Sequence, residues 1–193
     1  MKVSDIPNIL TIIRLFLVIP LVILLLSEEY AIALTIFVIA GLSDGLDGLL
    51  AKRFGWTSRF GSIADPLADK LLMVSSFFVL CWQGELPWRL FVAILLRDLV
   101  IVGGALSYNH LFGLEEVKPT LLSKYNTFVQ ILLVVVVIYD LATDLVPDLF
   151  QQSLLYLVLA LTIASGVQYS STWGRKAVKN VKQDNFREHT DDD

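Results

Sequence analysis

The sequence predicts an all-α integral membrane protein, with six transmembrane helices in one bundle and both termini in the cytoplasm. Of its 193 residues, 55% are hydrophobic and only 18% are charged, a composition too apolar for a soluble domain. The apolar residues gather in six runs of about 20 residues each, the length that crosses a membrane as a helix. The longest stretches are apolar on every face, which favours helices in lipid over the alternating strands of a β-barrel.

Each predicted helix rests on its own apolar run. The first, residues 6–26, contains LVILLL and lacks a small-residue cleavage site, so we expect a retained helix rather than a signal peptide. The second and third, residues 30–50 and 64–82, flank a polar segment, and the fourth spans residues 87–106. The fifth and sixth, residues 125–143 and 150–169, contain ILLVVVVI and LLYLVLAL. We therefore predict one six-helix domain over residues 1–173 and a charged cytoplasmic tail over residues 174–193.

The basic residues predict the orientation. Eleven of the 15 Lys and Arg residues fall on one side of the six-helix arrangement: Lys2, Lys52, Arg53, Arg59, Lys118, Lys124, Arg175, Lys176, Lys179, Lys182 and Arg187. The opposite side holds Arg89 among acidic residues. Because basic connections stay in the cytoplasm, both termini are expected there. The net charge of −4 owes much to the three aspartates at the end of the sequence, and nucleic acid is excluded as a partner because no basic surface is available to bind it.

Four aspartates interrupt the apolar pattern between the second and third predicted helices, where lipid makes charge costly and therefore indicative of function. They form two pairs, Asp44 with Asp47 and Asp65 with Asp69. Spacings of three and four residues place each pair on one face of its helix. The pairs are mirror-placed about residue 56, so a turn there would bring all four carboxylates together near the cytoplasmic surface.

Four close carboxylates predict a metal site. They repel one another unless cations neutralise them, and carboxylates without Cys or nearby His favour Mg²⁺ or Mn²⁺ over zinc. Two such ions would neutralise four carboxylates and suit a displacement at phosphorus. In the structural alternative, which spacing leaves open, the carboxylates cap helix ends and pair with Lys52, Arg53 and Arg59. The small residues Gly48 and Gly61 fit either close helix packing or the approach of a nucleotide.

This segment resembles the signature of the CDP-alcohol phosphatidyltransferase family. It reads Asp44-x-x-Asp47-Gly48-x-x-Ala51-Lys52, then eight residues, then Gly61-x-x-x-Asp65-x-x-x-Asp69. Lys52 departs from the family, which usually has Arg there and so gains a two-pronged phosphate contact. The resemblance implies two metal ions on the four aspartates, with Asp69 also the general base. It assigns contacts with the CDP moiety to Gly48, Lys52, Ser58 and Gly61.

Three further cations are candidates for binding the acceptor: Arg14, Arg97 and Lys124. The alternatives are ion pairing within the bundle, for example of Arg97 with Asp98, and snorkelling of the side chains toward headgroups.

The opening IPNILTIIR, residues 118–130 and residues 174–182 resemble the cardiolipin synthase branch of the family. This implies transfer of a phosphatidyl group from CDP-diacylglycerol to phosphatidylglycerol, giving cardiolipin and CMP. It also implies a bacterial or mitochondrial inner membrane, a site facing the cytoplasm or matrix, and, as in many members, a homodimer. The sister branch makes phosphatidylglycerophosphate from glycerol 3-phosphate and shares Asp65-Pro-Leu-Ala-Asp-Lys70. It usually follows its fourth-helix Arg with Glu and another Arg, whereas Asp98 follows Arg97 here.

Two unrelated classes of function also fit intramembrane carboxylates or the hydropathy, a divalent-cation transporter and an inert scaffold. Transporters commonly place their sites at the bilayer midplane, on broken helices of repeated halves, and no internal repeat is present. Carboxylates beside a basic connection instead favour chemistry on a lipid headgroup.

Overall fold

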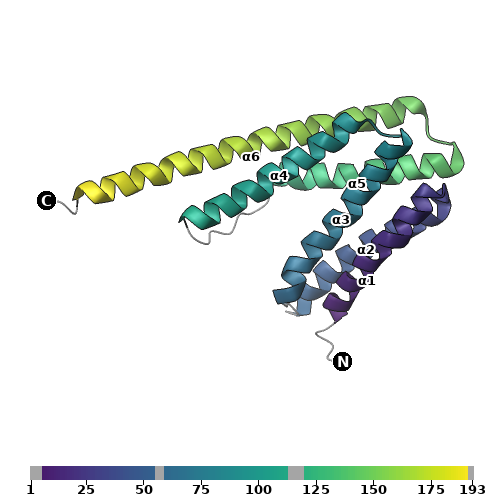
Figure 1. Cartoon of the computed structure of the whole chain (residues 1–193), viewed down its shortest axis with the longest axis horizontal. Coiled ribbons are helices and arrows are strands. Elements are labelled where there is room, and N and C mark those ends of the chain that lie inside the picture. Colours follow the sequence, from purple (N-terminus) through teal and green to yellow (C-terminus); the bar gives the residue numbers. More distant parts are fainter. Residues whose placement is uncertain (1–5, 55–58, 113–119, 191–193) are drawn as a thin grey trace. The chain divides into compact units, whose positions relative to one another are not determined.

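The computed structural model is all-helical over the residues that it describes. It describes the backbone of residues 6–54, 59–112 and 120–190, and the side chains of residues 10–43, 67–104 and 120–171. Within these ranges the chain forms helices and no strand (Figure 1). The helices are α1 (Ile6–Leu26), α2 (Tyr30–Phe54), α3 (Arg59–Gln83), α4 (Trp88–Phe112), α5 (Leu121–Thr143) and α6 (Asp148–Thr190).

All six predicted apolar runs lie on these helices, which confirms the all-α fold class. Five runs are contained whole, and the run at 87–106 begins one residue before α4. Several helices continue beyond their runs, α2 as far as Phe54 and α4 as far as Phe112. A helix is held by hydrogen bonds of its own backbone, so it can outlast the apolar stretch that predicts it.

Helix α6 is 43 residues long and continues through most of the predicted tail. The predicted boundary at residue 173 lies within this helix, and the backbone is helical on both sides of it. Asp148 stands in the first turn, where a negative charge stabilises the helix N-terminus. The division into a domain and a tail remains a prediction.

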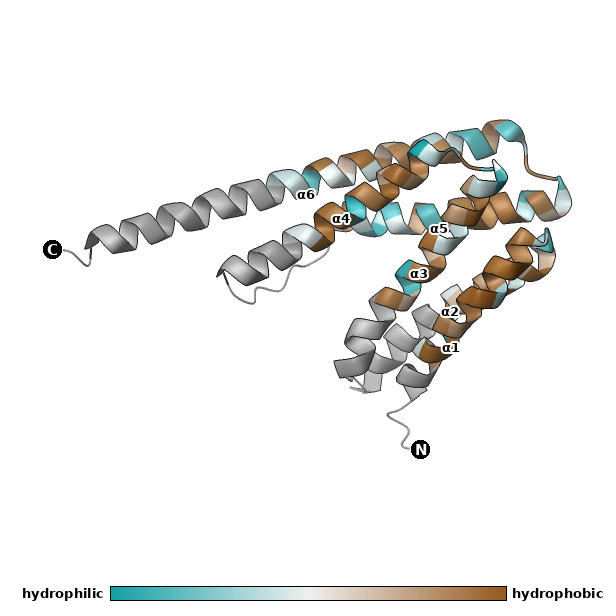
Figure 2. Ribbon diagram, viewed as in Figure 1, coloured by the Kyte–Doolittle hydropathy of each residue, from teal (hydrophilic) through white to brown (hydrophobic). Residues whose placement is uncertain are grey.

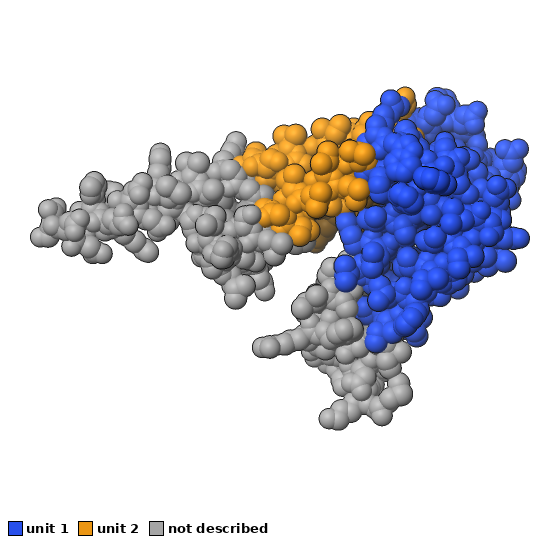
Figure 3. Space-filling view, viewed as in Figure 1, with its two compact units in different colours: residues 1–91, 131–153 blue, residues 92–130, 154–193 orange. Residues whose placement is uncertain are grey.

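The chain divides into two compact units, one formed by residues 1–91 and 131–153 and the other by residues 92–130 and 154–193 (Figure 3). In the first unit α1, α2 and α3 lie side by side, and α1 packs against both neighbours (Figure 1). The interior of this three-helix layer is apolar: Leu21 and Leu25 of α1, Phe37 of α2, and Phe77 and Leu80 of α3 are almost completely buried. Burial of such side chains is the main stabilising contribution.

The ends of α1 and α3 are joined by a side-chain cap. Glu28 adopts a left-handed conformation with φ of 60° and ends α1, while the Glu29 N–H donates to the Leu24 carbonyl at 2.9 Å. Gln83, the last residue of α3, donates from Nε2 to the Leu25 carbonyl at 2.7 Å. The Leu25 carbonyl also accepts from the Glu28 N–H at 3.1 Å, so it receives two hydrogen bonds at the end of α1.

In the second unit, Thr120 caps α5. Its Oγ1 accepts a hydrogen bond from the Ser123 N–H at 3.2 Å, the usual geometry of a helix N-cap. The Thr120 N–H in turn donates to the hydroxyl of Tyr169 on α6 at 3.2 Å. The start of α5 is thereby attached to α6.

The surface of the described residues is strongly apolar. Two segments are long and apolar enough to cross a membrane, Leu121–Thr143 and Asp148–Ser171, and shorter apolar segments are Leu10–Leu26 and Tyr30–Ser43. Figure 2 shows hydrophobic residues along much of the described helices and hydrophilic residues near the connections. Large apolar side chains are exposed, for example Phe16 at 66% and Leu149 at 78%. Such a surface is typical of a protein that associates with lipid. The six spans and the orientation of the termini remain predictions.

Candidate functional site

The two predicted aspartate pairs lie on consecutive helices that contact each other. Asp44 and Asp47 belong to α2, and Asp65 and Asp69 belong to α3. The backbone is helical at all four positions, as the prediction assumed. The side chains of Asp44, Asp47 and Asp65 lie outside the described residues, and so the convergence of the four carboxylates remains a prediction.

The residues predicted to contact the CDP moiety also lie outside the described side chains. They are Gly48, Lys52, Ser58 and Gly61. The backbone places Gly48 and Lys52 on α2 and Gly61 on α3, the same two helices that carry the aspartates. Nothing further is assigned to them from the structure.

Asp69 is the predicted site residue whose side chain is described on α3. It is half-buried, next to the almost completely buried Ala68 and followed by the buried Leu72. A half-buried carboxylate on a packed helix is held in place yet still accessible to a substrate. The segment from Asp44 to Asp69 contains carboxylates but no Cys or His. Carboxylate oxygens are the ligands that hard divalent cations prefer, so the residue types present fit such an ion.

Arg14 lies inside the first unit. Its side chain is 1% exposed on α1, the helix that packs against both aspartate-bearing helices. This burial excludes the snorkelling alternative, which requires the charged head to reach water or headgroups. A guanidinium is stable at such a position when negative or polar groups surround it. Its location is therefore consistent with the predicted anionic site on α2 and α3.

Arg97 is the centre of a buried polar cluster in the second unit. Its Nη1 donates to Asp98 Oδ1 at 2.8 Å, and both side chains are about 7% exposed. Its Nε donates to Ser165 Oγ at 3.3 Å, and its Nη2 donates to Ser123 Oγ. The guanidinium is thus held by α4, α5 and α6 together. The ion pair expected in the structural alternative is present.

A second layer of buried polar groups follows between α5 and α6. The Thr162 hydroxyl donates to Asn126 Oδ1 at 3.0 Å and accepts from Gln130 Nε2 at 3.3 Å. Sequence reasoning missed these residues, together with Ser123 and Ser165, because it searched for ionisable groups. A signal existed, since the polar residues recur at helical spacing within apolar runs.

Lys124 is not part of this cluster. Its side chain is exposed on α5, whereas that of the preceding Ser123 is buried and contacts Arg97. Of the three cations predicted to bind the acceptor, the structure therefore buries Arg14 and Arg97 and leaves Lys124 on the surface. Snorkelling of Lys124 toward headgroups agrees with this exposure.

A groove of about 660 Å³ runs between α4 and α6 beside Arg97. Its polar lining includes Arg97 and Thr162, and its walls are mostly apolar, among them Leu96 and Val167. These two wall residues are well exposed, whereas Arg97 is buried at the base. A charged base with apolar walls suits an amphiphilic molecule better than a fully polar one.

Comparison with known proteins relates α1 to α5 and the first part of α6 to one family. Residues 4–164 match the model of the CDP-alcohol phosphatidyltransferase family. The chain is 31% identical to cardiolipin synthase (CMP-forming) from Rattus norvegicus and 32% identical to that from Homo sapiens. Each alignment covers 92% of this chain and 64% of the relative. The chain thus spans less than two thirds of the length of these relatives.

A relative from the sister branch matches as well. The chain is 33% identical to CDP-diacylglycerol–glycerol-3-phosphate 3-phosphatidyltransferase 1, chloroplastic, from Oryza sativa subsp. japonica. This alignment covers 76% of this chain and 50% of the relative. Both branches resembled by the sequence are therefore represented among the related proteins.

Proposed function

Since the chain belongs to the CDP-alcohol phosphatidyltransferase family, we propose that it is a membrane enzyme of phospholipid biosynthesis that makes cardiolipin. It transfers a phosphatidyl group from CDP-diacylglycerol to phosphatidylglycerol and releases CMP. The observation that carries this proposal is the similarity to two cardiolipin synthases over 92% of the chain. It also speaks against a divalent-cation transporter or an inert scaffold.

The donor site is proposed on α2 and α3. Asp44, Asp47, Asp65 and Asp69 would hold two Mg²⁺ or Mn²⁺ ions, which when bound would neutralise charge on the diphosphate and on departing CMP. Gly48 and Gly61 would leave room for the nucleotide. Lys52 and Ser58 would bind its phosphate and hydroxyl oxygens. The composition of the donor set supports this assignment, because carboxylates are the preferred ligands of both ions.

Asp69 is proposed as the general base. The acceptor hydroxyl oxygen forms a bond to the lipid-side phosphorus while the bond from that phosphorus to CMP breaks, and Asp69 takes up the hydroxyl proton. A positioned carboxylate of this kind contributes about 10²- to 10⁴-fold to the rate. Its half-buried position supports the role, since the base must meet both the protein interior and a substrate.

The acceptor is proposed to be a lipid that enters the site laterally from the bilayer. The groove between α4 and α6 has exposed apolar walls and Arg97 at its base, as a phosphodiester with acyl chains requires. Arg97 is already paired with Asp98, so the groove offers little surplus positive charge. This suits the single charge of phosphatidylglycerol better than the dianionic phosphate of glycerol 3-phosphate. Arg14 and Lys124 are proposed as additional cations for the acceptor.

Glycerol 3-phosphate is the second candidate acceptor. The relative from Oryza sativa supports it, because its name specifies this acceptor and its alignment covers 76% of the chain. In that case the product would be phosphatidylglycerophosphate. The donor site on α2 and α3 would be unchanged.

The membrane arrangement is part of the proposal. All six helices would cross the bilayer as one domain over residues 1–173, with both termini and the charged tail in the cytoplasm or matrix. The bacterial inner membrane is the proposed location, with the mitochondrial inner membrane as the alternative. The charge asymmetry of the connections supports this orientation. A homodimer is the proposed assembly, because many members of the family are homodimers.

A paired-acceptor assay tests the function. The purified full chain is given CDP-diacylglycerol, Mg²⁺ or Mn²⁺, and both phosphatidylglycerol and glycerol 3-phosphate, and the lipid products are identified by mass. We expect CMP and cardiolipin. Accumulation of phosphatidylglycerophosphate without cardiolipin would select the second candidate. If no CMP is released with either acceptor, the enzyme proposal is wrong.

A further inference from the structure

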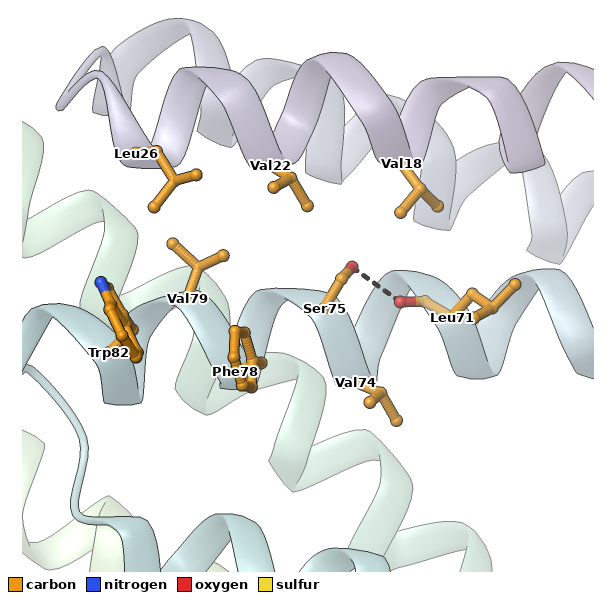
Figure 4. A pocket seen from close by; sticks show the side chains of 9 residues that line it. All are labelled: Val18, Val22, Leu26, Leu71, Val74, Ser75, Phe78, Val79 and Trp82. Carbon is orange, nitrogen blue, oxygen red and sulfur yellow. Dashed lines mark hydrogen bonds between the residues drawn. The ribbon is translucent and has the colours of Figure 1, made fainter.

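A second groove, of about 510 Å³, lies within the first unit between α1 and α3. Figure 4 shows Val18, Val22 and Leu26 of α1 facing residues of α3 across it. The α1 residues are four apart and form one row along that helix. Two similar rows line the groove from α3: Leu71, Ser75 and Val79, and Val74, Phe78 and Trp82. The groove therefore runs along the helix axes rather than across them.

The lining offers almost nothing to a polar ligand. Eight of its nine side chains are apolar or aromatic, with Ser75 as the exception. The Ser75 hydroxyl donates to the Leu71 carbonyl at 2.7 Å within its own helix (Figure 4). Its single proton is therefore already used. The groove is suited to hydrocarbon.

The length of the groove is comparable with the depth of hydrocarbon in one leaflet of a bilayer. Residues 18 to 26 rise about 12 Å along α1 at roughly 1.5 Å per residue. The hydrocarbon of one leaflet is about 15 Å deep, half of the roughly 30 Å core. The groove is thus long enough to hold most of one acyl chain that lies along the helices.

The two ends of the groove differ in character. Arg14 lies one turn before Val18 in the same α1 row, and Lys70 lies one turn before Val74 in an α3 row. Both cations belong to the end next to Asp69, which is two residues from the lining residue Leu71. The opposite end holds Leu26 and Trp82 (Figure 4). Cations at one end and hydrocarbon along the rest match an amphiphile with an anionic head.

The wall near Trp82 is stiffened by aromatic packing. Phe78 stacks on Trp82 with ring centroids 6.3 Å apart and meets Phe91 edge-on at 6.0 Å. Such pairs favour one arrangement of the rings beyond their apolar burial. The far end of the groove is therefore a defined shape and can discriminate between chains of different length.

We propose that this groove holds one acyl chain of the CDP-lipid donor and that Val22 and Trp82 determine its preference for acyl chains. The inference rests on the proposed function, because it places the donor head at the site that includes Asp69. The diphosphate lies at the end next to Asp69 and Lys70, and the chain extends past Val22 toward Trp82. Donor selection then depends on the tail as well as on the nucleotide.

Filling the groove tests this role. Val22→Trp places a large ring between the rows, and Ile23→Trp places the same ring on the neighbouring residue, which is 57% exposed and outside the lining. CMP release is measured with dioleoyl and with dibutanoyl CDP-diacylglycerol. We expect Val22→Trp to lower kcat/KM for the dioleoyl donor by about tenfold, as expected for a blocked hydrophobic pocket. The dibutanoyl donor, and Ile23→Trp with either donor, should change less than about twofold.

Different outcomes would overturn the acyl-chain groove and the proposed enzyme activity. An unchanged kcat/KM for the dioleoyl donor, or an equal loss with both donors, would overturn the acyl-chain groove. Absence of CMP release by the unaltered protein would instead overturn the proposed function. Val22→Phe serves as the milder variant if Val22→Trp does not elute as a folded protein.

Photolabelling of the unaltered protein provides a measurement that needs no variant. CDP-diacylglycerol with a diazirine near the end of one acyl chain is irradiated in phosphatidylcholine vesicles that contain the protein. We expect labelled peptides within residues 71–82, and loss of label with excess unmodified CDP-diacylglycerol. Equal labelling by phosphatidylcholine carrying the same group would mean ordinary boundary lipid and would overturn the proposal. So would labelling confined to other helices, or a crosslinked pair of chains joined through this face.

Discussion

The guanidinium of Arg97 both belongs to a buried hydrogen-bonded cluster and lines a groove. Its pairing with Asp98 neutralises a buried charge, and its hydrogen bonds to Ser123 and Ser165 fix the orientation of the guanidinium plane. The same side chain lines the groove between α4 and α6. Arg97 thus contributes to the stability of the fold, and under the proposed function it would also bind the anionic acceptor.

Replacement of Arg97 should reveal both effects. Arg97→Ala leaves the Asp98 carboxylate buried without its cation, which typically costs about 3–5 kcal/mol. If Arg97 also binds phosphatidylglycerol, KM for that lipid should rise about tenfold, and more than KM for CDP-diacylglycerol. Thermal unfolding and steady-state kinetics measure the two. Arg89→Ala, an exposed position in the first turn of α4, is the control and should change stability by less than about 0.5 kcal/mol.

A double variant separates the binding role from the stability. Arg97→Met with Asp98→Leu removes both charges, and apolar replacement of a buried pair is often neutral or stabilising. We expect the stability to recover and the KM for phosphatidylglycerol to stay raised. Recovery of both quantities would show that Arg97 acts in folding alone.

The variant Asp69→Asn tests whether Asp69 accepts the proton of the acceptor hydroxyl. The amide keeps the shape of the side chain but cannot take up the hydroxyl proton, so turnover should fall by about 10²- to 10⁴-fold. Binding of CDP-diacylglycerol, measured separately by equilibrium titration, should be largely retained. Asp144→Asn, at an exposed position with φ of 54° that Asn readily adopts, should behave like the unaltered protein. An equal loss of binding and turnover would identify Asp69 as chiefly a metal ligand.

Helices α2 and α3 form the element that concentrates the proposed donor chemistry. Phe54 ends one and Arg59 begins the other, and the two helices contact each other. The four aspartates therefore lie on neighbouring helices, on either side of one short connection. Under the proposed function, these two consecutive helices would supply all four carboxylate ligands.

Metal removal should abolish transfer if that set binds ions. EDTA should reduce CMP release to background, and excess Mg²⁺ or Mn²⁺ should restore it, because four carboxylates need cations to approach one another. Asp44→Ala, Asp47→Ala and Asp65→Ala should each lose activity while the protein still inserts into the membrane. Glu85→Ala, in the exposed connection after α3, is the control. Undiminished activity in EDTA would contradict the two-metal site.

The whole molecule is organised by the contrast between apolar helices and an uneven distribution of charge. Most Lys and Arg residues lie near the amino terminus, at the end of α2 and the start of α3, around the start of α5 and in the last part of α6. Exposed apolar side chains cover the described helices. Together these features favour a membrane-associated protein, and the basic residues support the proposed orientation toward the cytoplasm.

Thiol labelling tests this orientation. The single natural cysteine, Cys81, is 2% exposed and should react slowly, and Cys81→Ala removes it altogether. Ser27→Cys, between α1 and α2, should react with a membrane-impermeant maleimide in intact bacterial cells. Lys118→Cys should react only after the membrane is opened. The reverse pattern would invert the topology, and reaction of both in intact cells would contradict six spans.

The sequence by itself determined the helices and the family. Hydrogen bonds within a helix are local, so six apolar runs were enough to locate six helices, and where the helices extend further they continue into polar residues. The family signature is local too, because its residues lie within one stretch of 26 positions. The placement of the aspartates on two consecutive helices could therefore be predicted from the sequence. The close approach of their carboxylates is still a prediction.

Tertiary structure alone decided which distant side chains meet. Arg97 contacts Ser123 and Ser165, which are 26 and 68 residues away, and neither hydroxyl carries a charge that would have attracted attention in the sequence. The burial of Arg14, the exposure of Lys124 and both grooves likewise depend on how helices pack. Such contacts are set by the shapes of facing helix surfaces, and no single stretch of sequence contains both surfaces.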